Sequence, residues 1–82
     1  MSSIKNITYT SENGNTYKGF CVRKGVTKIR QIVVFEGKYI TDGQTYSKTE
    51  QASMDSVAQQ ILWELVNGRT LAARQYVEGV NF

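Results

Sequence analysis

Hydrophobic and polar residues alternate along much of Ile4–Thr41, which is the spacing of β-strands that bury one face. Three turn signals divide this segment into four strands: Asn13-Gly14, Lys24–Thr27 and Glu36-Gly37. Asn-Gly favours a type I′ hairpin turn because both residues tolerate positive φ angles. The pattern therefore predicts an antiparallel meander in which each strand pairs with the next.

Each turn also predicts a pairing register, and directly opposed residues lie on the same face of a sheet. An error of one residue would move all the side chains of a strand to the other face. The predicted opposed pairs are Ile7 with Phe20, Thr10 with Tyr17, Val22 with Ile29, Cys21 with Arg30, Phe35 with Lys38, and Val33 with Ile40.

These pairings sort the side chains of the strands onto two faces. The inner face is apolar, and it consists of Ile7, Phe20, Val22, Ile29, Val33, Phe35 and Ile40. The outer face mixes basic, aromatic and apolar side chains, and it consists of Tyr17, Cys21, Arg23, Lys28, Arg30, Ile32, Val34, Tyr39 and Thr41. The inner face needs a covering layer, whereas the outer face has the composition of a contact surface.

A helix after the strands supplies that layer. Ser47–Glu50 reads as a capping box, and Asn67-Gly68 supplies a stop, so a helix of about nineteen residues is expected. Thr70 is expected to cap a second, short helix that continues through Glu78. The apolar stripe of the long helix consists of Met54, Val57, Ala58, Ile61, Leu62 and Leu65.

The predicted fold is therefore a single small α+β domain over residues 1–82. A four-stranded antiparallel meander sheet packs on one long C-terminal helix, and a short helix follows. A chain of 82 residues has a modest core, near the size at which oligomerisation often adds stability. A homodimer is accordingly one expected assembly.

Charge is distributed unevenly along the chain, which carries ten basic and seven acidic residues. Basic residues dominate residues 18–48, whereas acidic residues are in slight excess from Thr49 onward. This segregation favours a polyanionic partner for the sheet, although lysines also keep edge strands soluble. The candidate nucleic-acid-binding residues are Arg23, Lys24, Lys28, Arg30, Tyr17, Tyr39 and Lys38.

Ile32 and Val34 are unexpected on the outer face, because a solvated face normally alternates to polar residues. Three explanations fit: a nucleic-acid groove, a back-to-back dimer that buries both residues, or coverage by long neighbouring side chains.

Trp63 lies opposite the core stripe of the helix. It either packs on residues of the C-terminal tail (Leu71, Tyr76 or Phe82) or anchors an interface.

The later strands and the helix carry a glycine-lysine hairpin, a last strand, a glycine, and then an acidic, alanine-rich helix: Gly37-Lys38, Ile40, Gly43, Glu50, Ala52 and Ala58. With this run, the segment Gly19–Leu62 resembles the β-sheet-plus-helix DNA-binding domain of plant ethylene-response factors and of the arm-binding ends of phage integrases. In that family, the two strands before the last turn insert basic and aromatic side chains into the major groove. The corresponding strands of this chain carry Arg23-Lys24, Lys28 and Arg30, and the resemblance implies the same role for them. An extra first strand, a central strand without tryptophan and a C-terminal tail depart from that family.

The same segment is also similar to the double-stranded-RNA-binding domain, whose hairpin leads into an alanine-rich helix. Ser47-Lys48 matches the opening of that helix. The N-terminal helix of that family, which contacts RNA, has no counterpart in this sequence. DNA is therefore the favoured nucleic acid.

Catalytic chemistry is not expected. The chain has no histidine, its carboxylates at Glu12, Glu36 and Asp42 occupy separate turns, and Ser47 and Ser53 read as helix-start residues. No cofactor or metal site is expected. Cys21 is the single cysteine, and it is expected to be a small residue of the sheet. A single cysteine favours an intracellular, cytoplasmic setting. No membrane segment is expected.

Two functions fit these observations. The first is a small nucleic-acid-binding module that uses the basic face of its sheet, such as a regulator or accessory factor of a phage or mobile element. The second is a small protein-binding inhibitor or adaptor of the phage counter-defence type, expected to be dimeric, that acts through the same face. The residues expected at a protein interface are Ile32, Val34 and Trp63.

Overall fold

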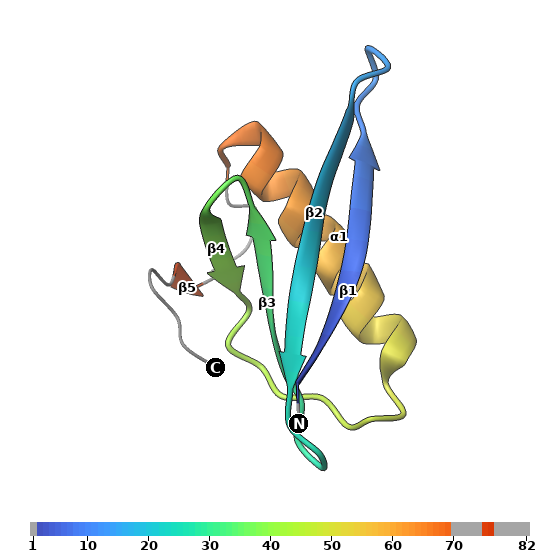
Figure 1. The fold of residues 1–82 in the computed structure, drawn as a ribbon, viewed down its shortest axis with the longest axis vertical. Helices are drawn as coiled ribbons and strands as arrows, with labels where there is room; N and C mark the ends of the chain where they lie inside the picture. The colour runs from blue at the N-terminus through green and yellow to red at the C-terminus, as the bar shows by residue number, and fades with distance from the viewer. Residues whose placement is uncertain (1, 70–74, 77–82) are drawn as a thin grey trace.

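The computed structural model describes residues 2–69 and 75–76 of the chain. Its strands form one antiparallel sheet in the order β1-β2-β3-β4-β5, and the helix lies across one face of that sheet (Figure 1). In chain order the elements are β1 (Ser2–Thr10), β2 (Thr16–Lys24), β3 (Arg30–Phe35), β4 (Lys38–Thr41), α1 (Gln51–Asn67) and β5 (Gln75–Tyr76). Within the described residues, no helix has both the length and the apolar character needed to span a membrane.

The predicted fold class is confirmed, since β1 to β4 form a four-stranded antiparallel meander packed against one helix. The expected short helix over residues 70–78 lies outside the described residues, apart from Gln75 and Tyr76. Those two residues form β5 and pair with Thr41 and Ile40 at the far edge of the sheet.

The first predicted turn is wrong in its register. Thr10 lies opposite Thr16, not Tyr17, and Ile7 lies opposite Gly19. The Gly14 N–H donates to the Ser11 carbonyl at 3.0 Å, and the Ser11 N–H donates to the Asn15 carbonyl at 2.8 Å. Gly14 has φ +87°, so this loop has the pattern of a four-residue turn followed by a glycine bulge rather than a two-residue type I′ turn.

The second predicted turn is also wrong. Lys24 lies opposite Arg30 and Val22 opposite Ile32, so the connection is longer than expected. Ile29 does not pair with β2 but forms an isolated bridge with Tyr46, with N–H to carbonyl distances of 2.7 and 2.8 Å. Ile29 is buried as predicted, but it packs in a small separate cluster with Tyr46 and Met54.

The third turn has the predicted register, because Phe35 lies opposite Lys38 and Val33 opposite Ile40. Both errors displace β2 by an odd number of residues, so β2 alone is inverted relative to the prediction. Phe20 and Val22 consequently lie half-buried on the outer face, away from the helix. The inner face of β2 carries Tyr17, Gly19, Cys21 and Arg23, which corrects the predicted outward position of Tyr17, Cys21 and Arg23.

The main core lies between the sheet and α1, whose predicted apolar stripe is confirmed. Gly19 lies directly under the helix: a Cβ atom built there would be 2.9 Å from Leu62 Cδ1 and 2.8 Å from the Val34 carbonyl oxygen. Gly19 therefore permits the close approach of α1 to the centre of the sheet. The buried residues of this core are Ile7, Cys21, Val33, Phe35, Ile40, Ala58, Ile61, Leu62 and Leu65.

The ends of α1 match the predicted signals in part. The Ser47 N–H donates to Glu50 Oε1 at 2.9 Å, which is one half of the predicted capping box. The Ser47 hydroxyl instead lies 2.8 Å from the Thr49 hydroxyl, so it makes no cap bond to α1. At the other end, Gly68 adopts the left-handed conformation with φ +65° and ends the helix as expected.

Substituting Gly19→Ala tests this packing. The added methyl group would collide with the β3 backbone and with Leu62, so the variant should lose about 1–3 kcal/mol of unfolding free energy. Lys18→Ala, on the exposed outer side of the same strand, is the control and should change stability by less than about 0.5 kcal/mol. Urea denaturation followed by circular dichroism measures both, and equal stability of Gly19→Ala and wild type would contradict the predicted clash.

Candidate nucleic-acid interface

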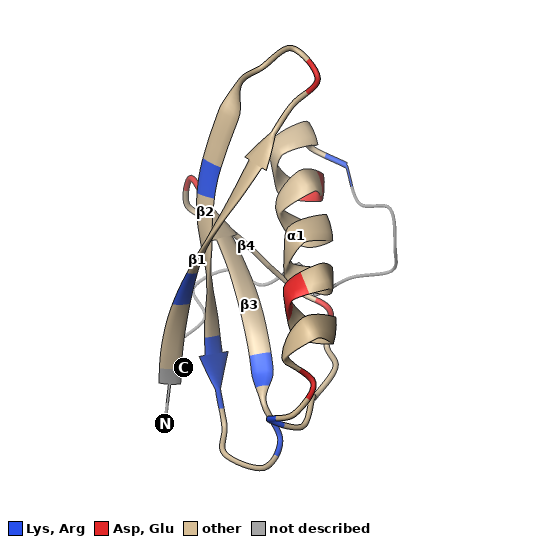
Figure 2. Ribbon diagram, turned by 90° about the vertical axis from the view of Figure 1, so that its right-hand side faces the viewer, with Lys and Arg blue, Asp and Glu red and all other residues tan. Residues whose placement is uncertain are grey.

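The face of the sheet opposite α1 is the candidate site, because α1 covers only the other face (Figure 2). Side chains on this outer face form rows that run across the strands. The first apolar row is Ile4–Val22–Ile32, and the second row is Asn6–Phe20–Val34–Tyr39. The outer face therefore has an apolar centre with polar residues toward the ends of the strands.

Accessibility differs strongly within these rows. Ile32 and Val34 are only 3% and 9% exposed, so the two residues predicted at the centre of an interface offer little area to a partner. Phe20, Val22 and Tyr39 are half-buried. Ile4 is 69% exposed at the edge of the sheet, and it presents more apolar surface than any other residue of the first row.

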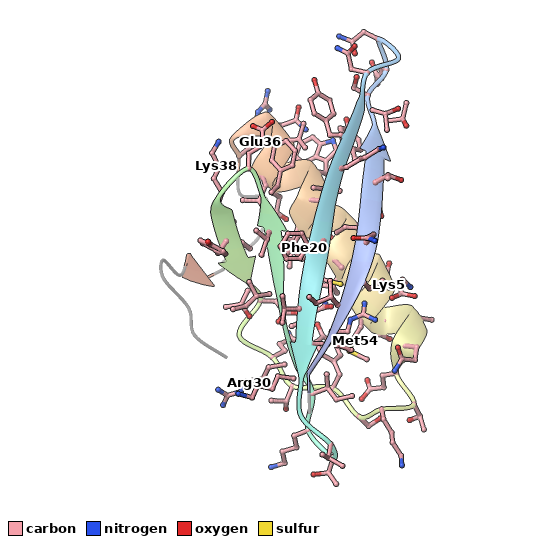
Figure 3. The ribbon with its side chains drawn as sticks, viewed as in Figure 1. Lys5, Phe20, Arg30, Glu36, Lys38 and Met54 are labelled. Atoms are coloured by element: carbon pink, nitrogen blue, oxygen red, sulfur yellow. The ribbon has the colours of Figure 1, made fainter. Side chains whose placement is uncertain are left out.

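Basic side chains gather at one end of the outer face. Lys24 and Arg30 are directly opposed across β2 and β3, and Lys28 lies in the loop that joins these strands. Arg30 extends from this end of the sheet, while Lys38 lies at the other end (Figure 3). Directly opposed like charges disfavour a strand pair, so this arrangement costs stability. We call Lys24, Lys28 and Arg30 the hairpin cluster.

No acidic residue compensates the hairpin cluster on the strands. β1 to β4 contain no Asp or Glu, whereas α1 contains Asp55 and Glu64 and no Lys or Arg (Figure 2). Both ion pairs in the described part of the chain involve Asp55, and neither uses a residue of the hairpin cluster. The charge segregation expected from the sequence is thus present between the sheet and the helix.

Arg23 is not part of this surface. It is only 7% exposed on the inner face, where its Nε donates to Gln31 Oε1 at 3.1 Å and its Nη2 donates to Asp55 Oδ1 at 2.7 Å. A longer contact of 3.4 Å joins Nη1 to Gln51 Oε1. Lys5 Nζ pairs with the second Asp55 oxygen at 2.7 Å. Arg23 therefore joins the sheet to α1 and is not available to a phosphate.

Two buried neighbours of Arg23 complete this junction. Gln31 is fully buried, and its Nε2 donates to the Met54 carbonyl of α1 at 2.9 Å. Cys21 is also fully buried, and its burial raises the pKa of the thiol despite the opposing effect of the nearby Arg23 charge. The raised pKa favours the neutral thiol, as expected for a small core residue and not for a nucleophile.

The predicted aromatic residues separate onto the two faces. Tyr17 lies on the inner face, stacked on Tyr9 with ring centroids 6.1 Å apart and edge-on to Phe35 at 6.0 Å. Tyr39 remains on the outer face, opposite Val34. Lys38 shares the face of Phe35, at an exposed turn.

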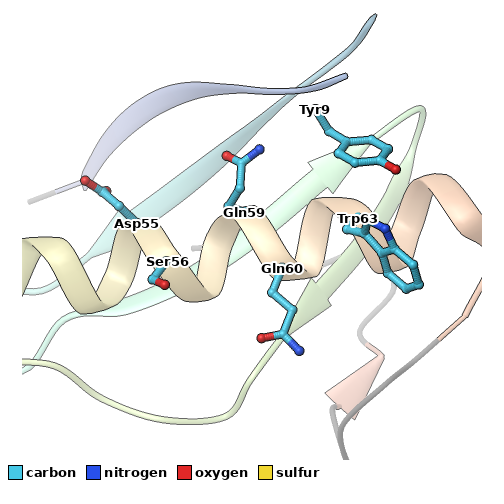
Figure 4. Close-up of a pocket in the computed structure, with 6 residues that line it drawn as sticks. All are labelled: Tyr9, Asp55, Ser56, Gln59, Gln60 and Trp63. Atoms are coloured by element: carbon cyan, nitrogen blue, oxygen red, sulfur yellow. The ribbon is translucent and has the colours of Figure 1, made fainter. Parts of the chain in front are cut away.

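Trp63 is half-buried and lies beside Tyr9 in an open groove between β1 and α1 (Figure 4). Its expected contacts with Leu71, Tyr76 or Phe82 fall outside the described side chains. An interface role for Trp63 therefore stays a prediction.

The structure brings together Lys24, Lys28, Arg30 and Tyr39 from the predicted set. It adds Lys18, Phe20 and Val22, which sequence reasoning placed elsewhere or left out. The alternation of Lys18, Phe20, Val22 and Lys24 along β2 is itself a signal that these four side chains share one face.

Replacing Asp55 tests the junction. Hydrogen bonds from Lys5 and then Arg23 hold the pKa of Asp55 below its usual range. A lowered folded-state pKa means that the stabilisation is present above the unfolded-state pKa of about 4 and is lost as pH falls through the folded-state value. Asp55→Asn should therefore lower the unfolding free energy at neutral pH by about 1–2 kcal/mol, discounted because the Asp55 side chain is 40% exposed.

The difference in unfolding free energy between Asp55→Asn and wild type should become smaller as pH falls from about 5 to about 3. Protonation of Asp55 removes the same negative charge from the wild type. Guanidinium unfolding at several pH values measures this difference. Glu12→Gln removes an exposed loop carboxylate and should cost less than about 0.5 kcal/mol. A difference in unfolding free energy that does not change with pH would contradict a stabilising role for the charge of Asp55.

Comparisons with known proteins leave the function to be argued from this geometry. No family model matches the chain, and neither a curated protein nor a solved structure matches it.

Proposed function

We propose that this protein is a small nucleic-acid-binding module that contacts its ligand with the outer face of its sheet. The hairpin cluster is the observation that carries the proposal. Lys24 and Arg30 face each other directly, Lys28 lies between them in sequence, and no described ion pair neutralises them. A polyanion would relieve the repulsion among these cations, and phosphate groups are well suited to lysine and arginine side chains.

The remaining outer-face residues extend the contact along β2. Lys18 adds a cation one row beyond Phe20, opposite Thr8. Phe20 and Tyr39 supply aromatic rings for bases, and Val22 supplies apolar surface for a thymine methyl group. DNA is favoured over RNA on the strength of the sequence resemblance, in a role such as a regulator or accessory factor of a phage or mobile element.

A salt series tests the proposal. Fluorescence anisotropy with labelled duplex DNA, duplex RNA and single strands gives the slope of log affinity against log salt. Lys24→Ala/Arg30→Ala should weaken binding and reduce the magnitude of this slope by about two units, since each lost phosphate contact contributes about one. Both side chains are exposed, so the variant should keep its fold.

Lys48→Ala/Arg69→Ala is the matched control. It also removes one lysine and one arginine, both exposed and both flanking α1. Its slope should equal that of the wild type. Binding that is insensitive to salt, or equal slopes in the two double variants, would contradict nucleic-acid binding through the hairpin cluster.

A second candidate function is a protein-binding inhibitor or adaptor, of the counter-defence type, that uses the same face. Ile4 at 69% and Val26 at 66% are the exposed large apolar residues among those described, and Ile4 continues the row of Val22 and Ile32. Such surface favours a protein contact, including a second copy of this chain.

The dimeric form of this alternative predicts a concentration-dependent mass. Light scattering at high micromolar concentration should show a dimer, and Ile4→Lys should convert it to a monomer by placing an unpaired charge in the contact. Thr8→Lys, which adds the same charge outside the Ile4–Val22–Ile32 row, is the control. A strictly monomeric wild type would exclude the homodimer.

A further inference from the structure

β1 is one of the two edge strands of the sheet, and no described strand pairs with its outer side, so its outward backbone groups can be assigned. In an antiparallel pair, every second residue directs both its N–H and its carbonyl away from the partner strand. The Ser11 N–H donates to the Asn15 carbonyl across the hairpin. The odd-numbered residues of β1 therefore direct their backbone N–H and carbonyl groups toward β2. The Thr8 carbonyl accepts from the Gln59 side chain of α1, which agrees with an outward direction for even-numbered residues. Ile4, Asn6 and Thr8 therefore direct their backbone groups to the outer side of β1.

This edge lacks the usual protection against an added strand. Natural edge strands are kept short, carry proline or a free lysine, or contain a bulge. β1 has nine residues, and its register with β2 runs from Ser2 to Thr10 without interruption. Its single charged residue, Lys5, is paired with Asp55 on the inner face.

An open groove runs beside this edge, between β1 and α1. Six residues line it, of which Tyr9 comes from β1 and the others from α1: Asp55, Ser56, Gln59, Gln60 and Trp63 (Figure 4). A second hollow shares Tyr9 and Trp63 and continues to Glu12 in the β1–β2 loop. A strand added at β1 would direct alternate side chains into this groove.

Among the described residues, the groove and the adjoining hollow lack the free cations of the hairpin cluster. Asp55 lines the groove and Glu12 lines the adjoining hollow, while α1 contributes no lysine or arginine. Asp55 is already paired with Lys5 and Arg23, so Glu12 is the acidic group here that no described ion pair neutralises. A phosphate backbone is disfavoured beside Glu12, where no free lysine or arginine among those described is available to it. A neutral or basic peptide is favoured, and Tyr9 and Trp63 offer aromatic surface to a large apolar side chain.

We propose that an extended, neutral or basic peptide segment of a partner protein binds as an added strand along β1. Main-chain hydrogen bonds to Ile4, Asn6 and Thr8 supply much of its affinity, and an aromatic or large apolar side chain between Tyr9 and Trp63 supplies specificity. Gln59 releases the Thr8 carbonyl as the peptide binds. This site is separate from the outer face and does not depend on nucleic-acid binding.

A random nonapeptide library displayed on phage is the probe. It is selected on the wild-type chain and counter-selected on Asn6→Pro, which removes an outward N–H without removing a bond to β2. Asn6→Thr is the matched control, because it changes the same exposed side chain and keeps the N–H. Trp63→Ala tests the groove separately, so the proposal stays testable if Asn6→Pro does not fold.

The enriched peptides should alternate β-branched or aromatic residues and carry no net negative charge. The best of them, synthesised with a fluorescent label, should bind Asn6→Thr within about twofold of wild type. It should bind Asn6→Pro and Trp63→Ala about tenfold more weakly, as expected for a lost hydrogen bond or aromatic contact.

Three results would overturn the proposal: no enrichment on the wild type, predominantly acidic selected peptides, or equal affinity for wild type and Trp63→Ala. A wild-type dimer that becomes monomeric in Asn6→Pro would assign the edge to a second copy instead. Unchanged salt-dependent DNA binding in Trp63→Ala would show that the two sites are independent.

Discussion

The orientation of β2 determines both surfaces of this protein. With its odd-numbered residues facing α1, the strand presents Gly19 and Cys21 at the centre, where small side chains let the helix approach. The same orientation brings Arg23 under α1, where it contacts Gln31 and Asp55. The even-numbered side chains, including Phe20, are left for the outer face. A β2 strand of the opposite orientation would place a bulky phenylalanine against the helix and an arginine in solvent.

The sequence was sufficient to predict β1 to β4, the helix α1 and the faces of three of those strands, but not β5, whose two residues fell in the expected short helix. Glu36-Gly37 permits a short turn, so the register of β3 and β4 followed from local chemistry alone. Asn13-Gly14 fits two turn geometries that differ by one residue, and local chemistry does not distinguish them. Ile29 does not pair within the second hairpin because it pairs with Tyr46. That pairing is non-local, so the preferences of turn residues do not indicate it.

For the candidate residues within β2, the predicted position depended on the predicted face of that strand, which was wrong. Lys24, Lys28 and Arg30 lie in or next to one loop, so their closeness follows from the sequence, whereas the shared face of Lys24 and Arg30 depends on the orientation of β2. Arg23 and Tyr17 lie within β2, and they moved to the core with it. The junction of Arg23 with Asp55 joins residues far apart in the sequence, and no motif indicated it.

The bridge between Ile29 and Tyr46 has a consequence for ligand affinity. Two backbone hydrogen bonds from Tyr46, in the segment before α1, hold Ile29, the residue that follows Lys28 in the loop. A loop held in this way has less conformational freedom to lose when its side chains are immobilised by a ligand. Part of the conformational entropy of the loop that carries Lys28 is therefore lost during folding, so a ligand of the proposed site would have less of it to order, whatever its charge.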